Sequence, residues 1–216
     1  MKDYSKDSIK IYVSDNLDWS SKDLLNERFK DFFFVKQIHS WNIYFVENEE
    51  DLKNSRIVEY DWIITNLSNI KIGVQLADCN WIAIYWKEYI GIFHAGWGWL
   101  YNKIIENWIK LLKEKWEEIN ELRVFVWPSI RNCCYEVWNE FLDYFDKKYF
   151  HENISWKLNF DMISVIRDIL DEAWINNENI EINNICTKCT RGYFSYRNWN
   201  LTERFVVWIE KIKNKK

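Results

Sequence analysis

The sequence lacks the features that mark several broad classes of binding protein. Basic residues are not in excess, because 29 Lys and Arg stand against 33 Asp and Glu. This balance argues against nucleic acid as a partner and provides no polybasic arm for a membrane. No apolar run is long enough to cross a bilayer, and the polar residues 1–4 do not resemble a signal peptide. Five cysteines, an odd number, form no secreted-type framework. We therefore expect a cytoplasmic protein with free thiols.

Glycine is scarce and tryptophan is abundant. The chain has 5 Gly and 15 Trp, whereas average usage would give about 15 glycines. Trp174 and Trp199 stand where a helix end and a turn favour glycine, and an indole at positive φ clashes with the backbone. We hypothesise that many of these tryptophans are glycine in the native protein, through a UGA codon read as glycine at source. The alternative is a chain with a tryptophan-rich core, and Trp108, Trp116 and Trp208, in apparent helices, fit that alternative better.

Strands outnumber helices in the predicted secondary structure. Apolar runs predict strands at 9–13, 32–38, 43–46, 61–66, 72–77, 82–85, 89–94, 122–126 and 180–185. The run at 43–46 either continues 32–38 or pairs with it. Helices are predicted at 20–30, 100–112, 137–149, 161–173 and 203–212. Asp161 is a plausible N-cap, and the short connection at 86–88 predicts an antiparallel hairpin. The pattern indicates an α/β or α+β class, with mixed sheets and helices outside.

Two of the three histidines stand in motifs at apparent strand ends. His39 ends the motif QIH at 37–39, and His94 begins the motif HAGW at 94–97. Between them, Cys79 follows Asp78 at the end of another apolar run. Two imidazoles and one thiolate are the ligands of an open zinc or copper site, in which one position stays free for water or substrate. The sequence therefore predicts a metal site of His39, Cys79 and His94, with Asp78 and Gln37 as neighbouring hydrogen-bonding groups.

The same residues allow a second interpretation. Cys79 and His94 would form the nucleophile and base of a cysteine enzyme, with Gln37 or Asp78 orienting the imidazole. Spacing along the chain does not separate this role from metal binding. The third histidine, His151, stands in a charged segment and is expected on the surface.

The other four cysteines form two close pairs. One pair is Cys133-Cys134, and the other is the C-x-x-C motif of Cys186 and Cys189. A structural zinc site is one interpretation of these pairs. Adjacent cysteines seldom hold one tetrahedral ion well, however, and the chain has no second C-x-x-C motif. We therefore expect these thiols to line a pocket.

Six motifs resemble the laccase-domain ("multicopper polyphenol oxidase") family, whose members are also described as purine nucleoside phosphorylases. They lie in the family's order over about residues 35–209: QIH at 37–39, DWIITN at 61–66, ADC at 77–79, HAGW at 94–97, PSIRNCCYEV at 128–137 and CTKCTRGYFSYR at 186–197. The family pattern has glycine where this chain has Trp41, Trp62, Trp99, Trp127 and Trp174, in line with the recoding hypothesis. The resemblance implies a single domain over residues 1–216, folded as a layered sandwich.

The resemblance also implies a metal-dependent enzyme of purine nucleosides. Its metal, zinc or alternatively copper, falls on His39, Cys79 and His94, and the catalytic group comprises Cys79, His94 and Asp78. The implied reactions are phosphorolysis of adenosine and inosine to the base and ribose 1-phosphate, deamination of adenosine, and cleavage of methylthioadenosine. A nucleoside and phosphate are therefore the expected partners.

Phosphate binding requires a cation, and two arginines in matched motifs are candidates. These are Arg131 and Arg197, which we expect to bind substrate together with Gln37. The chain departs from the family pattern at Gly98, where a basic residue is frequent, and at Glu203, where glycine is usual. Both departures bear on affinity for phosphate.

Three other functions remain open. A copper polyphenol oxidase would need far more imidazole ligands than 3 histidines supply. A cysteine-dependent hydrolase would be inhibited by a thiol alkylator and not by a chelator. A non-catalytic module in cell-wall precursor editing would bind metal or ligand without turnover. The sequence does not indicate an oligomeric state.

Overall fold

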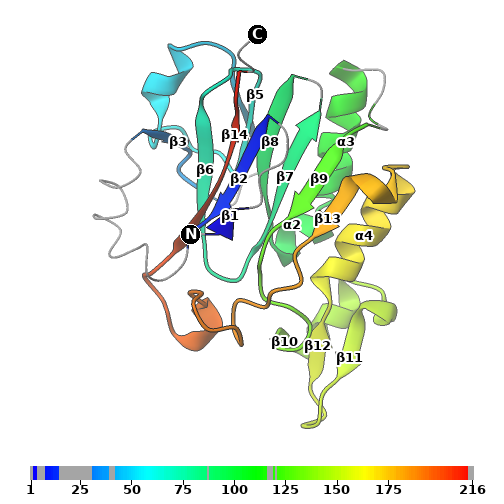
Figure 1. Ribbon diagram of the computed structural model, residues 1–216. Coiled ribbons are helices and arrows are strands. Elements are labelled where there is room, and N and C mark those ends of the chain that lie inside the picture. The colour runs from blue at the N-terminus through cyan, green and yellow to red at the C-terminus, as the bar shows by residue number, and fades with distance from the viewer. Residues whose placement is uncertain are drawn as a thin grey trace.

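The computed structural model describes residues 2–3, 8–14, 31–38, 42–86, 88–115, 119 and 121–213. The predicted helix at 20–30 lies outside these residues, as do His39, Trp41 and Trp116. The described residues form three β-sheets and a small number of helices, arranged as in Figure 1. This architecture confirms the α/β class with mixed sheets. None of the helices in the described ranges combines the length and apolarity needed to cross a membrane.

The two larger sheets are both mixed. The five-stranded sheet has the order β1 (Lys2–Asp3), β2 (Ile9–Val13), β14 (Phe205–Lys211), β6 (Lys71–Leu76) and β3 (Phe32–Phe34). The six-stranded sheet has the order β13 (Ile180–Ile182), β9 (Arg123–Val126), β7 (Asn80–Trp86), β8 (Tyr89–Ala95), β5 (Trp62–Thr65) and β4 (Ile43–Val46). A small antiparallel sheet contains β10 (Glu136–Val137), β12 (Leu158–Phe160) and β11 (Phe150–Glu152).

The six-stranded sheet is the middle layer of a sandwich. Along β7, Trp81 and Ala83 point into a core shared with the five-stranded sheet, whereas Ile82 and Ile84 point into a second core. The second core is closed by the helices on the other face of the sheet (Figure 1). Successive side chains of a strand point to opposite faces, so a strand covered on both sides must be apolar throughout. This requirement explains the dense apolar runs in the sequence.

The hairpin predicted around residues 86–88 is confirmed. β7 and β8 pair antiparallel, with Trp86 opposite Tyr89 and Trp81 opposite His94. The strand at 43–46 is neither a continuation of 32–38 nor its partner, because β4 pairs parallel with β5 while β3 pairs parallel with β6. The two segments therefore belong to different sheets, which short-range pattern does not reveal.

The helix predicted at 100–112 is divided in two. α2 (Trp97–Tyr101) is separated from α3 (Ile104–Lys115) by Lys103, which has a positive φ of 59°. Asn102 supports this break, because its side-chain amide donates to the carbonyl of Gly98 at 2.6 Å. The apolar face of α3 packs on the six-stranded sheet, where Trp108 stacks on Phe93 at 5.2 Å between ring centroids.

The N-cap predicted at Asp161 is confirmed. Its Oδ1 accepts hydrogen bonds of 3.1 Å from the backbone N–H groups of both Ile163 and Ser164, at the start of α4 (Met162–Glu172). These bonds satisfy donors that the first helical turn leaves without a partner.

Two predicted helices are wrong. Residues 203–212 contain β14, which lies between β2 and β6, and its side chains alternate between two apolar environments. Its run of Val206, Val207 and Ile209 is β-branched and suits a central strand. Residues 137–149 form the end of β10 and two 3₁₀ helices, η2 (Asn139–Asp143) and η3 (Lys147–Tyr149). Asp146 starts the second by accepting from the N–H of Lys148 at 2.9 Å. Further 3₁₀ helices are η1 (Asp51–Asn54), η4 (Asn177–Asn179) and η5 (Tyr196–Asn198).

Two sets of tryptophans in the described part of the chain differ in backbone conformation and burial. Trp156, Trp174 and Trp199 have positive φ angles of 58°, 64° and 64°, and their side chains are 85–87% exposed. A bulky side chain gains nothing there that would offset the steric cost, which supports glycine at these positions. Trp62 and Trp127, in contrast, are buried at negative φ. The backbone therefore gives no reason for glycine at those two positions.

Candidate active site

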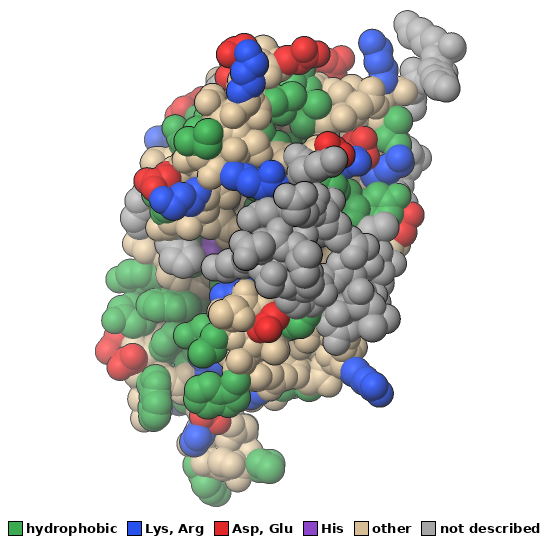
Figure 2. Space-filling model, turned by 90° about the vertical axis from the view of Figure 1, so that its left-hand side faces the viewer, with side chains coloured by type: hydrophobic (Ala, Val, Ile, Leu, Met, Phe, Trp, Pro, Cys, Tyr) green, Lys and Arg blue, Asp and Glu red, His purple; other side chains and the backbone are tan. Residues whose placement is uncertain are grey.

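Cys79 and His94 lie together at one end of the sandwich. Cys79 precedes β7, and His94 is the next-to-last residue of β8, so the pairing of these strands brings both side chains to the same edge. Both border a cavity of about 660 Å³. Figure 2 shows a histidine side chain set back in a hollow of one face. His39 lies outside the described residues, and its place at this site stays a prediction.

Asp61 orients the imidazole of His94. The side chain of Asp61 is fully buried, and its Oδ1 lies 3.4 Å from His94 Nδ1. Its Oδ2 accepts from the backbone N–H of Ile38 at 3.3 Å, so the same carboxylate holds the residue before His39. The predicted orienting residue was either Gln37 or Asp78, and in the structure Asp61 makes that contact. The polar start of the motif DWIITN was the sequence signal for this residue.

The charge state of His94 depends on its two neighbours. Burial by itself lowers the pKa of this imidazole. The negative charge of Cys79 opposes burial, as do hydrogen bonds to Asp61 and Cys79 and the charge of Asp61, and together they raise the pKa to about 9. Without another cation, these contacts therefore favour the protonated form of the His94 imidazole. A metal ion would take the place of that proton.

Two indole rings enclose His94. Trp81 stacks on it with ring centroids 4.7 Å apart, and Trp99 lies tilted against it at 4.2 Å. Gly96 makes room for Trp99, because a Cβ at Gly96 would lie 2.8 Å from the Trp99 ring and 3.8 Å from Cys79 Sγ. The ring of Trp99 thus occupies space directly beside both reactive side chains. If Trp99 is glycine in the native protein, that space belongs to the cavity.

Asp78 holds the loops of the site together. Its carboxylate accepts from Thr187 Oγ1 at 2.7 Å, from Ser195 Oγ at 2.9 Å and from the backbone N–H of Arg197 at 2.8 Å. Its carbonyl accepts from the N–H of Ile130 at 2.9 Å. Its φ of 81° is strained for a residue other than glycine. With both carboxylate oxygens engaged, Asp78 is better suited to positioning these loops than to proton transfer.

Two of the three predicted substrate-binding residues line the cavity, and the third does not. Gln37 and Arg197 line the cavity, and Gln37 is fixed there because its Oε1 accepts from the N–H of Gln75 at 3.2 Å. Arg131 is buried and does not line the cavity. Its guanidinium donates to the side chains of Asn80 and Ser129 and to two backbone carbonyls. This geometry does not support a phosphate-binding role for Arg131.

The cavity mouth contains polar and aromatic groups that the sequence did not single out. Arg204 lines it together with Arg197, and its guanidinium donates to the carbonyl of Glu203 at 2.7 Å. Tyr135 and Tyr196 also line the cavity, and the Arg197 guanidinium lies 5.1 Å from the centre of the Tyr135 ring. Tyr135 is distant in sequence from Tyr196, Arg197 and Arg204, so only the tertiary structure groups it with them.

The four remaining cysteines converge. The Sγ atoms of Cys133, Cys134, Cys186 and Cys189 all lie within 4.8 Å of one another, an arrangement that could hold a metal ion. None of these four thiols borders the active-site cavity, so the expectation that they line a pocket finds no support at that site. Their sequence pairs lie on two loops joined by a parallel bridge between Ser129 and Cys186. His151 is exposed in β11, as expected.

Comparisons with known proteins agree with this architecture. A family model described as "Multi-copper polyphenol oxidoreductase laccase" matches residues 3–210, which extends the expected range of about 35–209 towards the N-terminus. The hypothetical protein YfiH of Bacillus licheniformis has the same fold, with a TM-score of 0.82 at 20% identity, covering 95% of this chain and 93% of that one.

Two relatives whose names state an activity are similar in sequence. A purine nucleoside phosphorylase from Aquifex aeolicus is 38% identical over 157 residues, which is 73% of this chain and 73% of that protein. An adenosine deaminase from an unknown prokaryotic organism is 24% identical over 182 residues, 77% of this chain and 70% of that protein. The match of the family model over almost the whole chain is decisive, and the chain belongs to the multi-copper polyphenol oxidoreductase laccase family.

Proposed function

We propose that this protein is a metal-dependent enzyme that cleaves purine nucleosides with phosphate. The substrates would be adenosine and inosine, with methylthioadenosine as a further substrate and deamination of adenosine as a second activity. The observation that carries the proposal is the pair of Cys79 and His94 at the edge of a cavity of about 660 Å³. The similarity to a purine nucleoside phosphorylase and to an adenosine deaminase supports the choice of substrate.

The donor set fits zinc, with copper as the alternative. A thiolate and an imidazole are ligands that zinc prefers, and His39 is the proposed third. The contact between Asp61 and Nδ1 of His94 supports this role, because ligating histidines commonly give their other ring N–H to a carboxylate. When bound at this edge of the cavity, such an ion would supply Lewis-acid chemistry to the base or to water.

The other cavity residues are suited to holding the nucleoside and phosphate. Arg197 and Arg204 bring two guanidinium groups to the mouth, where they would pair with the oxygens of phosphate. Trp97, 39% exposed, and Tyr196, 54% exposed, offer ring faces to a purine. Gln37 presents an amide that is already fixed against β6. In this proposal, guanidinium groups would bind the anion and aromatic rings would stack on the base.

A specific observation also favours a second candidate, a cysteine-dependent hydrolase. Asp61, His94 and Cys79 are connected in series, as in enzymes where a carboxylate orients the base of a thiol nucleophile. Cys79 and Asp61 both raise the pKa of His94 against the effect of burial, as expected of a base held between a thiol and a carboxylate. In this candidate Cys79 attacks the substrate, and no metal takes part.

One experiment separates these functions. Purified protein is incubated with adenosine or inosine, with and without phosphate, and the base, ribose 1-phosphate and inosine are quantified. Phosphate-dependent release of the base supports the proposal, and phosphate-independent loss of ammonia alone would leave only the deaminase. Loss of activity with a chelator, restored by zinc, distinguishes the metalloenzyme from the hydrolase, which an alkylating agent alone would inactivate. Binding of metal or nucleoside without any turnover would contradict both and leave a non-catalytic module.

A further inference from the structure

The four-cysteine cluster has the dimensions of a tetrahedral thiolate site. Cys133 Sγ lies 3.8 Å from Cys134 Sγ and 3.9 Å from Cys189 Sγ, and all four sulfurs lie within 4.8 Å of one another. Zinc–sulfur bonds of about 2.3 Å in a tetrahedron place neighbouring sulfurs about 3.8 Å apart. Cys133 and Cys189 are exposed while Cys186 is buried, so an ion can enter from solvent. The four sulfur atoms therefore need to move only slightly to bind one ion.

The loop around Cys186 is already folded as a ligand loop. The backbone N–H groups of Arg131, Cys189 and Lys188 lie close enough to the Cys186 sulfur to act on it electrostatically. Donors of this kind orient a thiolate and spread its charge, as outer hydrogen bonds do around metal ligands. The N–H of Thr190 also bonds to the carbonyl of Cys186 at 3.0 Å, which closes the turn through the C-x-x-C motif.

A buried positive charge lies beside the cluster. Arg131 is 8% exposed, and the four hydrogen-bond acceptors of its guanidinium, on Asn80, Ser129, Trp127 and Asn183, are all uncharged. The negative charges that act on it are those of Cys186, Asp161 and Cys133. A buried cation requires compensating negative charge. A Zn²⁺ ion held by four thiolates has a net negative charge. The positive charge of Arg131 and an occupied cluster would therefore stabilise each other.

We propose that Cys133, Cys134, Cys186 and Cys189 bind one Zn²⁺ in a closed, structural site that is separate from the site at Cys79 and His94. All four ligands are thiolates from the protein, so no position remains for water or substrate. Binding releases the protons of those cysteines that are still thiols in the empty protein. The ion joins the loop at 131–136 to the loop at 186–197.

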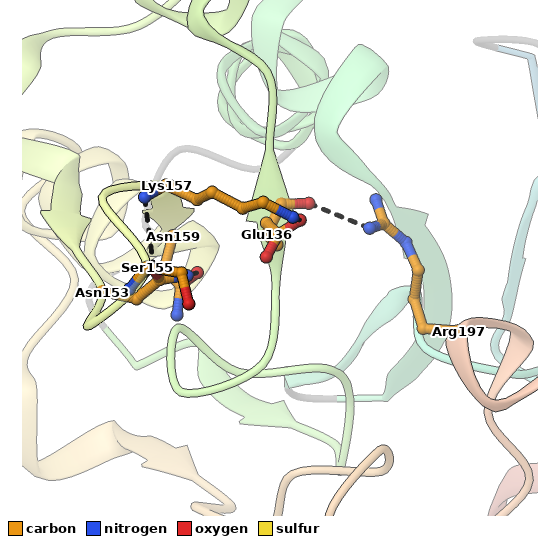
Figure 3. Close-up of polar contacts among 6 residues, drawn as sticks. All are labelled: Glu136, Asn153, Ser155, Lys157, Asn159 and Arg197. Carbon is orange, nitrogen blue, oxygen red and sulfur yellow. Dashed lines mark hydrogen bonds and ion pairs between the residues drawn. The ribbon is translucent and has the colours of Figure 1, made fainter.

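Both joined loops contribute to the cavity. Tyr135, which follows Cys134, lines the cavity, and Thr187, which follows Cys186, donates to the carboxylate of Asp78. Figure 3 shows a second link between the loops, in which Arg197 donates to the backbone carbonyl of Glu136 at 2.9 Å. A zinc ion at the cluster would therefore fix the positions of Tyr135 and Arg197 at the cavity mouth.

The test is metal binding by the full chain, measured with cobalt(II) as the spectroscopic probe and zinc by mass spectrometry. The Cys79→Ser variant lacks the first site and is expected to retain one equivalent of metal, with the charge-transfer bands of a cobalt thiolate. Combining it with Cys189→Ser is expected to abolish this binding. Cys79→Ser combined with Cys189→His is expected to retain the metal with a shifted spectrum, because three thiolates and one imidazole also hold zinc.

Several outcomes would overturn the proposal. Cobalt bands in Cys79→Ser that persist unchanged when Cys189→Ser is added would place the ion elsewhere. A folded Cys79→Ser protein that binds no metal under reducing conditions would also contradict the proposal. So would a disulfide among the four cysteines in protein that was prepared and kept under reducing conditions. The circular dichroism of each variant is recorded to establish folding. Because metal content is read without turnover, failure of the nucleoside activity does not affect this test.

Discussion

Two side-chain clusters that include cysteine lie near each other in this protein. They differ in the chemistry that each can support. Cys79 and His94 combine two kinds of donor and border a cavity of about 660 Å³. Cys133, Cys134, Cys186 and Cys189 offer four identical donors, none of which borders that cavity. A site that leaves a coordination position beside a cavity is suited to chemistry, whereas one that fills every position with protein is suited to holding loops. The two roles therefore depend on the number of protein donors and on the space beside them. The presence of cysteine alone does not distinguish a catalytic site from a structural one.

Substitution of one cysteine in each group is expected to give the largest contrast. Cys79→Ser should lower kcat/KM for inosine by more than about 100-fold, because loss of a supporting hydrogen bond to a metal ligand already costs 10–100-fold. Cys189→Ser should leave most of kcat but lower the thermal unfolding midpoint. Steady-state kinetics and thermal unfolding of both variants provide the comparison. Equal loss of kcat in the two variants would mean that both groups take part in chemistry.

The next effect concerns the positioning of His94. Asp61→Asn should lower kcat and the metal affinity of the Cys79 site by about 10–100-fold, because the neutral amide orients the imidazole less strongly. The KM for the nucleoside should change little, and the metal at the four cysteines should remain. The matched control is Glu59→Gln, which removes an exposed carboxylate two residues away that pairs with Lys36. A rise in KM and a fall in kcat, together with misfolding, would indicate a merely structural role.

A smaller effect is expected at the loop that connects the two groups. Arg197→Gln should raise the KM for phosphate by about 10-fold, corresponding to about 1.4 kcal/mol for a lost charge-assisted hydrogen bond. Arg191→Gln is the control, since Arg191 is exposed in the same loop and does not line the cavity. Phosphate titrations at saturating inosine measure both. An unchanged KM in Arg197→Gln would leave Arg204 as the phosphate-binding residue.

The smallest effect concerns backbone strain after the C-x-x-C loop. Trp199→Gly should raise the free energy of unfolding by about 1 kcal/mol, because Trp199 has a φ of 64° and is 85% exposed. Trp138→Gly is the control, since Trp138 is 76% exposed at a φ of −83° and should gain no such relief. Urea unfolding of both variants measures the difference. Destabilisation by Trp199→Gly would contradict the hypothesis that this position is glycine in the native protein, which the intact mass of natively expressed protein also tests.

The local sequence pattern was sufficient to predict those features whose contacts are made between residues close together in sequence. The β7–β8 hairpin and the N-cap at Asp161 depend on residues within a few positions of each other, and both were predicted correctly. The helix predicted at 203–212 was wrong because an apolar segment with mixed spacing fits both periods, and the position of β14 between β2 and β6 decided for a strand. Lys103 divided the helix predicted at 100–112 through a positive φ that lysine rarely adopts.

The sequence by itself determined the family resemblance, the class of fold and the strand ends that carry Cys79 and His94. Only the tertiary structure decided that Asp61 orients His94, that Arg131 points away from the cavity and that four cysteines from two loops meet. The physical reason is separation along the chain. Periodicity and capping are set by interactions within one element, whereas a shared site arises from packing between elements, whose register depends on the whole core.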